Sequence, residues 1–467
     1  MGILSEGIGI SQDETPVVDA ATKKGVIVHR GQVRFAYRLA EQHGSRLMHV
    51  HGLGWYHWDG TRWSPDHRGH ATNAVLAVLR NEWGHAFDDK DLAREVRSCE
   101  SASGVRGILD IAKALNPFAC TVADLDTDPY LLNVANGTVD LRTMQLMNHN
   151  PSDRLTKVTR AAYSPESQSD EWEQFLAQVL PDANVRAYLA RYVGVSLLGE
   201  VREQTFTIAK GAGANGKGVF YGAVLHALGD YGHTAESDLF MTTKSNANAA
   251  SPAIMALLGR RFVVCSETER DHKLAAALMK NLTGGDPITA RSLHRDPVTF
   301  DPSHTVMLVT NFLPKVAGDD PAVWRRMRVI PFDVEIPENQ RDAELGSRLQ
   351  LSADAILTWA MKGYRQYVSK GMETPEAVQA ATTEYRRRSD AVARFIEDRC
   401  FVGEASSVTV AALHDAWSEW AKDDGADAMS KNELMDEMDK RGFPSARTKT
   451  QRIRRGIGIL DDDERNA

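Results

Sequence analysis

The glycine-rich segment at residues 211–218 constrains this chain more than any other feature. It reads Gly-Ala-Gly-Ala-Asn-Gly-Lys-Gly, follows the apolar run 206–209 and precedes a helix-like segment at 219–228. A strand, a glycine-rich loop ending in lysine and a helix, in that order, are typical of a phosphate-binding loop. Backbone N–H groups, the helix N-terminus and the Lys217 ammonium would all face the phosphates. A tight structural turn is the alternative.

The pattern therefore predicts that the chain binds ATP through this loop. The contacting residues would be Gly211, Ala212, Gly213, Ala214, Asn215, Gly216, Lys217, Gly218 and Val219. Mg²⁺ is expected as the second cofactor, but the Ser or Thr that usually follows the lysine and binds this ion is replaced by Gly218. Water or another hydroxyl would take that place, with Thr207 and Ser266 as candidates. The departure affects turnover more than nucleotide binding.

Length and composition define the broad class. At 467 residues the chain exceeds one ordinary core and should form about three domains. No apolar run approaches the roughly 20 residues that span a bilayer, so no membrane contact is expected. The first residues lack the basic region and long apolar core of a secretory signal, which favours a cytoplasmic protein.

Cysteine spacing and net charge bear on metal sites, disulfides and nucleic-acid binding. The four cysteines lie far apart without a CxxC pair, which favours reduced thiols over a zinc ribbon or a disulfide framework. The formal net charge of −8 means that any nucleic-acid contact must come from local basic features.

The chain is predicted to be an α/β protein with five segments. Asp-Gly at 59–60 and Asn-Gly at 136–137 indicate hairpins, and helices are expected at 73–83 and 92–115. The tryptophans of the first hairpin favour packing, with a base-stacking platform as the alternative. The segments are a flexible N-terminus (1–30), a mixed α+β domain (31–199), a nucleotide-binding core (200–340), a helical lid or linker (341–388) and a small helical domain ending in a basic hairpin (389–467).

Polar residues that follow apolar strands are candidates for catalysis. The strand at 261–266 leads into Glu267, which is predicted to polarise water and to contact Mg²⁺, with Glu269 as its helper. Asn311 follows the strand 305–310 and would orient water or sense the γ-phosphate; a turn before a proline is the alternative. Arg325 or Arg326 is a candidate arginine finger for a neighbouring subunit, and surface ion pairs are the alternative.

These motifs together resemble the superfamily-three helicases, specifically the primase-helicases of phages, plasmids and poxviruses. The resemblance rests on the phosphate loop, the strand ending at Glu267, the segment Lys-Asn-Leu-Thr-Gly-Gly-Asp at 280–286, Thr-Asn at 310–311 and Trp-Arg-Arg at 324–326. Residues 130–199 resemble the domain that precedes the helicase in this family. The resemblance implies an AAA+-like helicase core at 200–340 and a winged-helix-like domain at 389–467.

The family also places a DNA-gripping hairpin between the catalytic-base strand and the sensor strand. Residues 288–293 and 297–300 would form it, with His294 and Arg295 at the tip and Lys280 and Arg291 as further DNA contacts. A solvated turn is the alternative. In the tail, helices are predicted at 410–423 and 431–441, followed by a basic hairpin that would bind DNA or dock a protein. Its cations are Arg447, Lys449, Arg452, Arg454 and Arg455.

The resulting interpretation is an ATP-dependent DNA helicase of a phage, prophage or plasmid, working as a homo-hexameric ring. Its expected partners are single-stranded and duplex DNA and a separate primase, polymerase or loader. Asp124 and Asp126 do not form a recognisable primase site, since such a site needs clustered carboxylates on a sheet. The alternatives are a primase-helicase with an unrecognised primase site and an ATP-gated origin-binding initiator or clamp.

Overall fold

The computed structural model describes residues 29–236, 239–242, 252–266, 272–293, 295–316, 320–449 and 451–460, and they form two compact units. The first unit comprises residues 29–58 and 64–121, and the second comprises residues 59–63 and the described residues from 122 onwards. The predicted N-terminal domain at 31–199 is thus divided. The reason is that residues 132–198 contribute to the same apolar core as the central sheet, whereas residues 35–118 form a core of their own.

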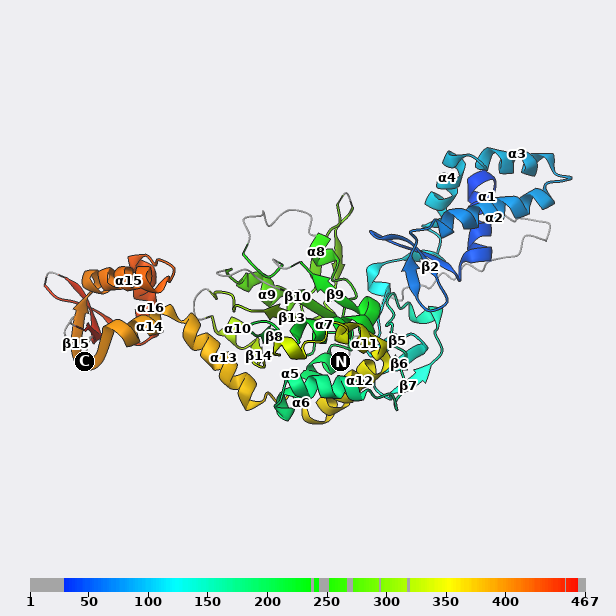
Figure 1. Cartoon of the computed structure of the whole chain (residues 1–467). Coiled ribbons are helices and arrows are strands. Elements are labelled where there is room, and N and C mark those ends of the chain that lie inside the picture. Colours follow the sequence, from blue (N-terminus) through cyan, green and yellow to red (C-terminus); the bar gives the residue numbers. More distant parts are fainter. Residues whose placement is uncertain are drawn as a thin grey trace, which may run out of the picture. The chain divides into compact units, whose positions relative to one another are not determined.

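The first unit combines four helices with a small sheet (Figure 1). The helices α1 (Gly31–His43), α2 (His70–His85), α3 (Lys90–Cys99) and α4 (Ala102–Ala112) bury Phe35, Val75 and Ile108. Strand β1 (Leu47–Val50) pairs antiparallel with β2 (Gly54–Trp58) and parallel with β4 (Ala119–Cys120), and β3 (Trp63–Pro65) is the neighbour of β2.

The prediction of a continuous helix at 92–115 is wrong, because the helix is interrupted between α3 and α4. Ser101 caps the second helix by accepting the backbone N–H of Gly104 at 3.1 Å. A Cβ at Gly104 would lie 2.6 Å from the Cα of Cys99, so only glycine permits this tight joint. The local capping interaction therefore outweighs the continuous helical pattern.

The second unit opens with a short meander of β5 (Leu131–Val134), β6 (Gly137–Asp140) and β7 (Gln145–Met147). The predicted hairpin is confirmed, but its turn lies one residue earlier, at 135–136, because Val134 pairs with Gly137. The meander is flanked by the short helices η1 (Val122–Asp124) and η2 (Pro151–Asp153), and α5 (Asp170–Val179) and α6 (Ala183–Val195) follow it.

A five-stranded parallel sheet forms the centre of the second unit, in the order β14-β8-β13-β10-β9. Its strands are β8 (Phe206–Lys210), β9 (Gly232–Ala235), β10 (Phe262–Ser266), β13 (Thr305–Thr310) and β14 (Met327–Pro331). The three central strands, β8, β13 and β10, carry near-continuous buried residues, as expected for a parallel sheet covered on both faces. The α/β class predicted for this region is confirmed.

Helices from distant parts of the sequence share one apolar core with this sheet (Figure 1). These helices are α5, α6, α7 (Lys217–Leu228), α11 (Leu345–Leu351) and α12 (Ala353–Lys370). Helices α6 and α12 approach to backbone contact: a Cβ on Gly363 would lie 2.0 Å from the Ala190 carbonyl oxygen. None of the described helices combines the length and the apolar character of a membrane span.

The remaining elements of the second unit before the C-terminal segment are mostly short. They are η3 (Gly229–Tyr231), α8 (Pro252–Met255), α9 (Ala276–Leu282), the antiparallel hairpin β11 (Ile288–Ala290) and β12 (Val298–Phe300), α10 (Pro321–Trp324), η4 (Glu338–Gln340) and α13 (Glu376–Ser389). The hairpin expected at 288–300 is therefore confirmed as an element.

The C-terminal segment has an apolar core of its own. Its elements, in sequence order, are α14 (Ala391–Arg399), β15 (Cys400–Thr409), α15 (Val410–Asp424), α16 (Lys431–Lys440), β16 (Ser445–Arg447) and β17 (Arg452–Ile459). The strands form an antiparallel sheet in the order β15-β17-β16, and Phe395, Trp417 and Leu434 fill the core. Ser430 and Glu433 form a capping box at the start of α16.

Candidate functional site

The loop at 211–216, which we call the phosphate loop, leaves β8 and enters α7 at Lys217. Gly213 has φ 116° and Gly216 has φ 77°, backbone conformations that side-chain-bearing residues rarely adopt. Gly216 also lies against α5: a Cβ there would be 2.5 Å from the side chain of Val179. The glycines at these positions are thus required by conformation and by close packing.

Neighbouring strands hold the phosphate loop in place. The backbone N–H of Gly211 donates to the carbonyl of Thr310 at 3.2 Å, at the end of β13. The amide of Asn215 donates to the carbonyl of Phe332 at 3.1 Å, just beyond β14. Because both anchors belong to the strands beside β8, the loop is fixed at the carboxyl edge of the sheet.

Lys217 lies at the centre of this edge. Its ammonium donates to the Gly211 carbonyl at 2.8 Å, to the Asn215 side-chain oxygen at 3.1 Å and to the Asn311 side-chain oxygen at 3.2 Å. The side chain is buried, with 6% of its surface exposed. These bonds hold the ammonium at the phosphate loop, where a cation is suited to contact an anionic ligand.

Parallel register explains why Asn311 reaches Lys217. Thr310 pairs with Lys210, and Ser266 pairs with Val309, so β8, β13 and β10 end at the same level. The structure therefore brings Lys217, Asn311 and Ser266 to one edge. Glu267 and Glu269, predicted to follow Ser266, lie outside the described residues.

The two hydroxyls considered for the Mg²⁺ place differ in position. Thr207 is wrong as a candidate, because it is fully buried within β8 and precedes the loop by four residues, about 13 Å along a strand. Ser266 ends β10 at the correct edge. Gly218 itself is exposed, and an added Cβ would meet nothing within 4 Å, so the position has room for a hydroxyl side chain.

A cavity of about 400 Å³ adjoins the phosphate loop. Phe175, Val219, Ile336 and Leu345 give it an apolar lining, and polar groups at its rim include Gln174, Gln178, Gln340 and Arg341. The Ile336 N–H donates to the Ala214 carbonyl at 2.8 Å, which joins the segment after β14 to the loop. The sequence pattern gave no signal for this cavity, since α5 and α11 are distant from the loop along the chain.

The two candidate finger arginines have different surroundings. Arg326 is 8% exposed and donates to the Ala322 carbonyl at 2.9 Å and to Gln204 at 3.1 Å; burial and the adjacent Arg325 lower its pKa. Arg325 is exposed. Both precede β14, whose first residue, Met327, pairs with the first residue of β8, so they lie at the edge of the sheet opposite the phosphate loop.

Lys280 is engaged within the fold. Its ammonium forms an ion pair with Asp320 at 2.9 Å, and Asp320 also caps α10 through the N–H of Ala322. The hydrogen bond from Lys280 and the N–H of Ala322 lower the pKa of this carboxyl. The specific motif around Lys280 thus positions α10, the helix that leads directly to Arg325.

The hairpin β11–β12 carries cations near its turn. Arg291 and Arg295 are exposed, and Leu293 between them has 66% of its surface exposed. One face of the hairpin is buried and anchors it to the fold. The buried residues are Ile288, Ala290, Val298 and Phe300. His294, the other predicted tip residue, lies outside the described residues.

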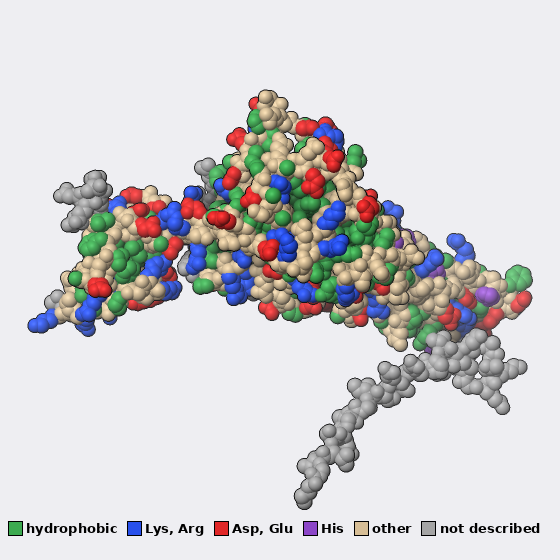
Figure 2. Space-filling model, turned by 90° about the horizontal axis from the view of Figure 1, so that it is seen from below, with side chains coloured by type: hydrophobic (Ala, Val, Ile, Leu, Met, Phe, Trp, Pro, Cys, Tyr) green, Lys and Arg blue, Asp and Glu red, His purple; other side chains and the backbone are tan. Residues whose placement is uncertain are grey.

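In the basic tail, Arg454 is wrong as a DNA contact. It is 4% exposed and forms an ion pair with Asp439 and a hydrogen bond to the Phe443 carbonyl at 3.0 Å. Its side chain faces α16, whereas the next residue, Arg455, lies on the opposite face of β17 and is exposed. The exposed cations are Arg447, Lys449, Arg452 and Arg455. On the molecular face shown in Figure 2, basic and acidic side chains are interspersed.

The two carboxylates considered for a primase site, Asp124 and Asp126, make contacts within the fold. Asp126 accepts the N–H of Thr156 at 2.9 Å and its hydroxyl at 2.6 Å. Asp124 pairs with Arg154 at 3.6 Å. Neither belongs to a three-residue group that could hold a metal ion among the residues described.

Comparison with known proteins gives matches in both halves of the chain. Residues 36–181 match the family described as "D5 N terminal like", and residues 209–326 match a family of unknown function (DUF5906). A protein of Acanthamoeba polyphaga mimivirus named "Putative helicase" is 28% identical over 378 residues, 76% of this chain and 39% of that protein. An African swine fever virus protein named "Putative primase" is 25% identical over 344 residues, 68% of this chain and 35% of that protein.

The solved structure of the NrS-1 C-terminal region, in its apo A form, matches with a TM-score of 0.52 at 11% identity, over 92% of this chain and 100% of that one. At this identity the likeness concerns the fold alone. The fold and the loop define an α/β protein with a phosphate-loop-like site on a parallel sheet. The sequence matches go further: the chain carries a D5 N-terminal-like region and is similar to viral proteins named as helicases and primases, which supports a primase-helicase family. It spans less than two fifths of the length of these two viral relatives.

Proposed function

We propose that this chain is an ATP-dependent DNA helicase that acts in the cytoplasm in the replication of a phage, prophage, plasmid or virus. It binds ATP and Mg²⁺ at the phosphate loop and moves along single-stranded DNA as a homo-hexameric ring. The viral relatives named for helicase and primase roles support a place in DNA replication.

The observation that carries this proposal is the meeting of Lys217 and Asn311 at 3.2 Å. They come from different strand ends, and a γ-phosphate bound by the lysine would lie within reach of the amide. This arrangement suits phosphoryl transfer, in which positioned charge and an oriented water lower the barrier. The neighbouring cavity of about 400 Å³ is large enough for a nucleobase, with Phe175 and Val219 at its apolar wall.

The sheet order supports an AAA+-like core. The strand that precedes the phosphate loop, β8, lies between β14 and β13, and β10 and β9 follow. Arg325 is exposed at the opposite edge from its own loop. An arginine in that position suits action on a neighbouring subunit, and this favours a ring over a monomer.

DNA contacts would come from two exposed basic elements. The first is the β11–β12 hairpin with Arg291 and Arg295. The second is the C-terminal segment, whose order of helices and strands suits a winged helix with β16–β17 as the wing. Arg447, Lys449 and Arg452 lie around the turn of that wing. Backbone contacts of this kind bind DNA without reading its sequence.

Steady-state ATP hydrolysis by the full chain, with and without single-stranded DNA, tests the proposal. We expect hydrolysis that requires Mg²⁺ and is stimulated by DNA, and a loss of at least about a hundredfold in Lys217→Ala, because the phosphate loses its counter-charge. Unchanged hydrolysis in Lys217→Ala would refute the site. The matched control is Lys210→Ala, which removes a cation from the end of β8, the strand that leads into the phosphate loop.

A second candidate function is an ATP-gated clamp or origin-binding initiator. Gly218 favours it, because a site without the usual hydroxyl can bind ATP and still turn it over slowly. Such a protein would bind DNA in an ATP-dependent manner without separating strands. A primase activity is tested separately by primer synthesis from ribonucleotides.

A further inference from the structure

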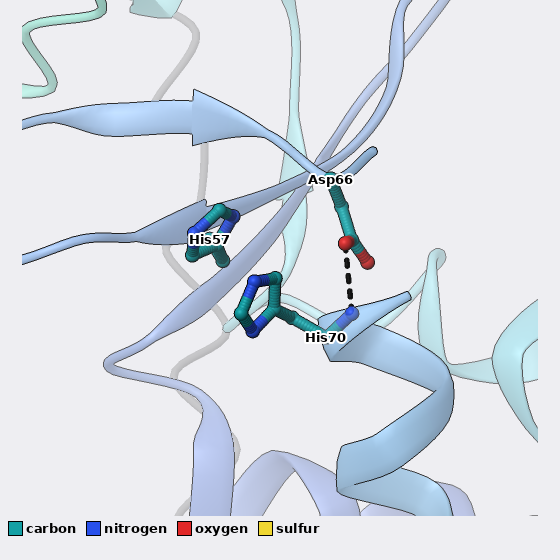
Figure 3. Close-up of side chains that lie close together, drawn as sticks. All are labelled: His57, Asp66 and His70. Carbon is teal, nitrogen blue, oxygen red and sulfur yellow. Dashed lines mark hydrogen bonds between the residues drawn. The ribbon is translucent and has the colours of Figure 1, made fainter. Parts of the chain in front are cut away.

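Three side chains with metal-binding chemistry lie together in the first unit: His57, Asp66 and His70 (Figure 3). Their possible ligand atoms all lie within 4.8 Å of one another, and no other group of three His, Cys, Asp or Glu in the described ranges meets this criterion. His57 belongs to β2, Asp66 follows β3 and His70 begins α2. Three segments of the chain therefore converge at this point.

The Asp66 carboxylate is fixed in place. One oxygen accepts the N–H of His70 at 2.7 Å and the other accepts the N–H of Ala71 at 2.8 Å. The Asp66 N–H in turn donates to the Trp55 carbonyl at 2.9 Å, on the strand that carries His57. Partial burial raises the pKa of Asp66, but the hydrogen bonds from the N–H groups of Ala71 and His70 lower it by more. The net pKa therefore lies below its ordinary value.

The carboxylate retains acceptor capacity beyond these bonds, since its two oxygens together offer about four lone pairs. Metal-ligating carboxylates are commonly held in this way by hydrogen bonds from the surrounding backbone. The two bonds to α2 are therefore compatible with coordination on the open side of the carboxylate.

The imidazole rings of His57 and His70 face each other. Their centroids are 3.8 Å apart and their planes differ by 18°. In this stacked arrangement the nitrogen lone pairs lie in nearly parallel planes, so the rings do not yet converge on a shared point. His70 is exposed at the first position of its helix, and its ring is able to turn towards the carboxylate. His57 is half-buried and supplies the fixed side of the site.

We propose that His57, Asp66 and His70 bind one divalent first-row transition-metal ion, for which Zn²⁺ is the best match. Zinc bonds of about 2.0–2.2 Å at tetrahedral angles place donor atoms about 3.4 Å apart, so a movement of roughly 1 Å and a turn of His70 complete the site. Two imidazoles favour Zn²⁺ over Mg²⁺ and Ca²⁺. The three protein ligands leave a fourth position for water or another donor. The ion would join β2 to the start of α2.

Equilibrium dialysis of the full chain against Zn²⁺, with Mg²⁺ in excess, tests this site. The wild-type chain is expected to hold one Zn²⁺ in the micromolar range or tighter, and His70→Ala and Asp66→Asn at least about tenfold more weakly. Asp66→Asn removes the charge and one of the two acceptors at the start of α2, whereas His70→Ala keeps both Asp66 oxygens in place, so the two variants together separate loss of a ligand from loss of the helix start. His67→Ala is the matched control, because it removes an exposed histidine from the same loop.

Thermal unfolding gives a second readout that does not depend on counting ions. Zn²⁺ should raise the melting temperature of the wild-type chain and of His67→Ala, and should leave His70→Ala unchanged, because a ligand stabilises only the state that binds it. Equal Zn²⁺ affinity in His70→Ala and wild type, or no binding in the micromolar range, would overturn the proposal and leave the cluster as a helix cap with a ring stack.

Discussion

At the scale of single residues, the site depends on contacts that span long stretches of sequence. Lys217 and Asn311 are 94 positions apart and meet at 3.2 Å. Asn215 reaches the chain beyond β14, at Phe332, with a 3.1 Å hydrogen bond. A lysine placed in this way meets a bound phosphate without a large movement, which lowers the cost of reorganisation during the reaction.

Gly218 gives the most direct residue-level prediction. The position is exposed and has room for a side chain, so Gly218→Ser should place a hydroxyl at the usual Mg²⁺ position. We expect the Mg²⁺ concentration that half-saturates ATP hydrolysis to fall severalfold. Gly222→Ser is the control, because Gly222 lies one turn later in α7 with equally open space. An equal effect of both substitutions would indicate helix stabilisation instead of metal binding.

Alanine substitutions should distinguish the roles of the two arginines that precede β14. Arg325→Ala should lower ATP turnover by about a thousandfold and leave the melting temperature unchanged, because it removes an exposed charge. Arg326→Ala should cost about 1–3 kcal/mol of stability, because it leaves Gln204 and the Ala322 carbonyl without their donor. Mixing Arg325→Ala with Lys217→Ala subunits should restore part of the hydrolysis. Failure of rescue at every ratio would argue against a shared site.

At the scale of elements, the β16–β17 hairpin of the C-terminal segment carries a cluster of exposed cations. Arg447 and Arg452 pair directly across the two strands, and both are exposed. Helix α16, by contrast, carries Glu433, Asp436, Glu437 and Asp439. The hairpin, more than the helix, therefore has the charge needed to contact phosphates.

Salt dependence of duplex binding tests this assignment. The double variant Arg447→Gln/Arg452→Gln should weaken binding and reduce the slope of log K against log salt by about 2, since each phosphate contact contributes about 0.9. Lys422→Gln, which removes an exposed cation from the end of α15, should leave the slope unchanged. An unaltered slope in the double variant would favour the alternative that the tail docks a protein.

Sequence patterns predicted the elements whose signals are local. The phosphate loop, the β5–β6 hairpin and the helices α15 and α16 follow from glycine spacing, turn residues and helical periodicity, whereas the hairpin at 288–300 was implied by the family resemblance. Positions decided by long-range packing were not predictable. Arg454 turns inward to Asp439, Arg326 inward to Gln204, and α5 folds back to line the cavity at the loop. The break between α3 and α4 depends on one serine cap.

At the scale of the whole molecule, the chain combines one unit with its own small core and a second built around the parallel sheet. The second unit contains the candidate nucleotide site, the β11–β12 hairpin and the basic β16–β17 hairpin. A motor needs these parts in one chain, because hydrolysis at the phosphate loop must be converted into movement of the bound strand. The proposed function requires that ATP hydrolysis by this chain separates DNA strands.

Strand separation on a forked duplex with Mg²⁺ and ATP is the most direct measurement of that requirement. The wild-type chain should release the displaced strand at a rate that depends on ATP, and Lys217→Ala should release none while it still binds DNA through the β11–β12 and β16–β17 hairpins. ATP hydrolysis and DNA binding by the wild-type chain without any strand release would contradict the helicase assignment and identify an ATP-gated clamp.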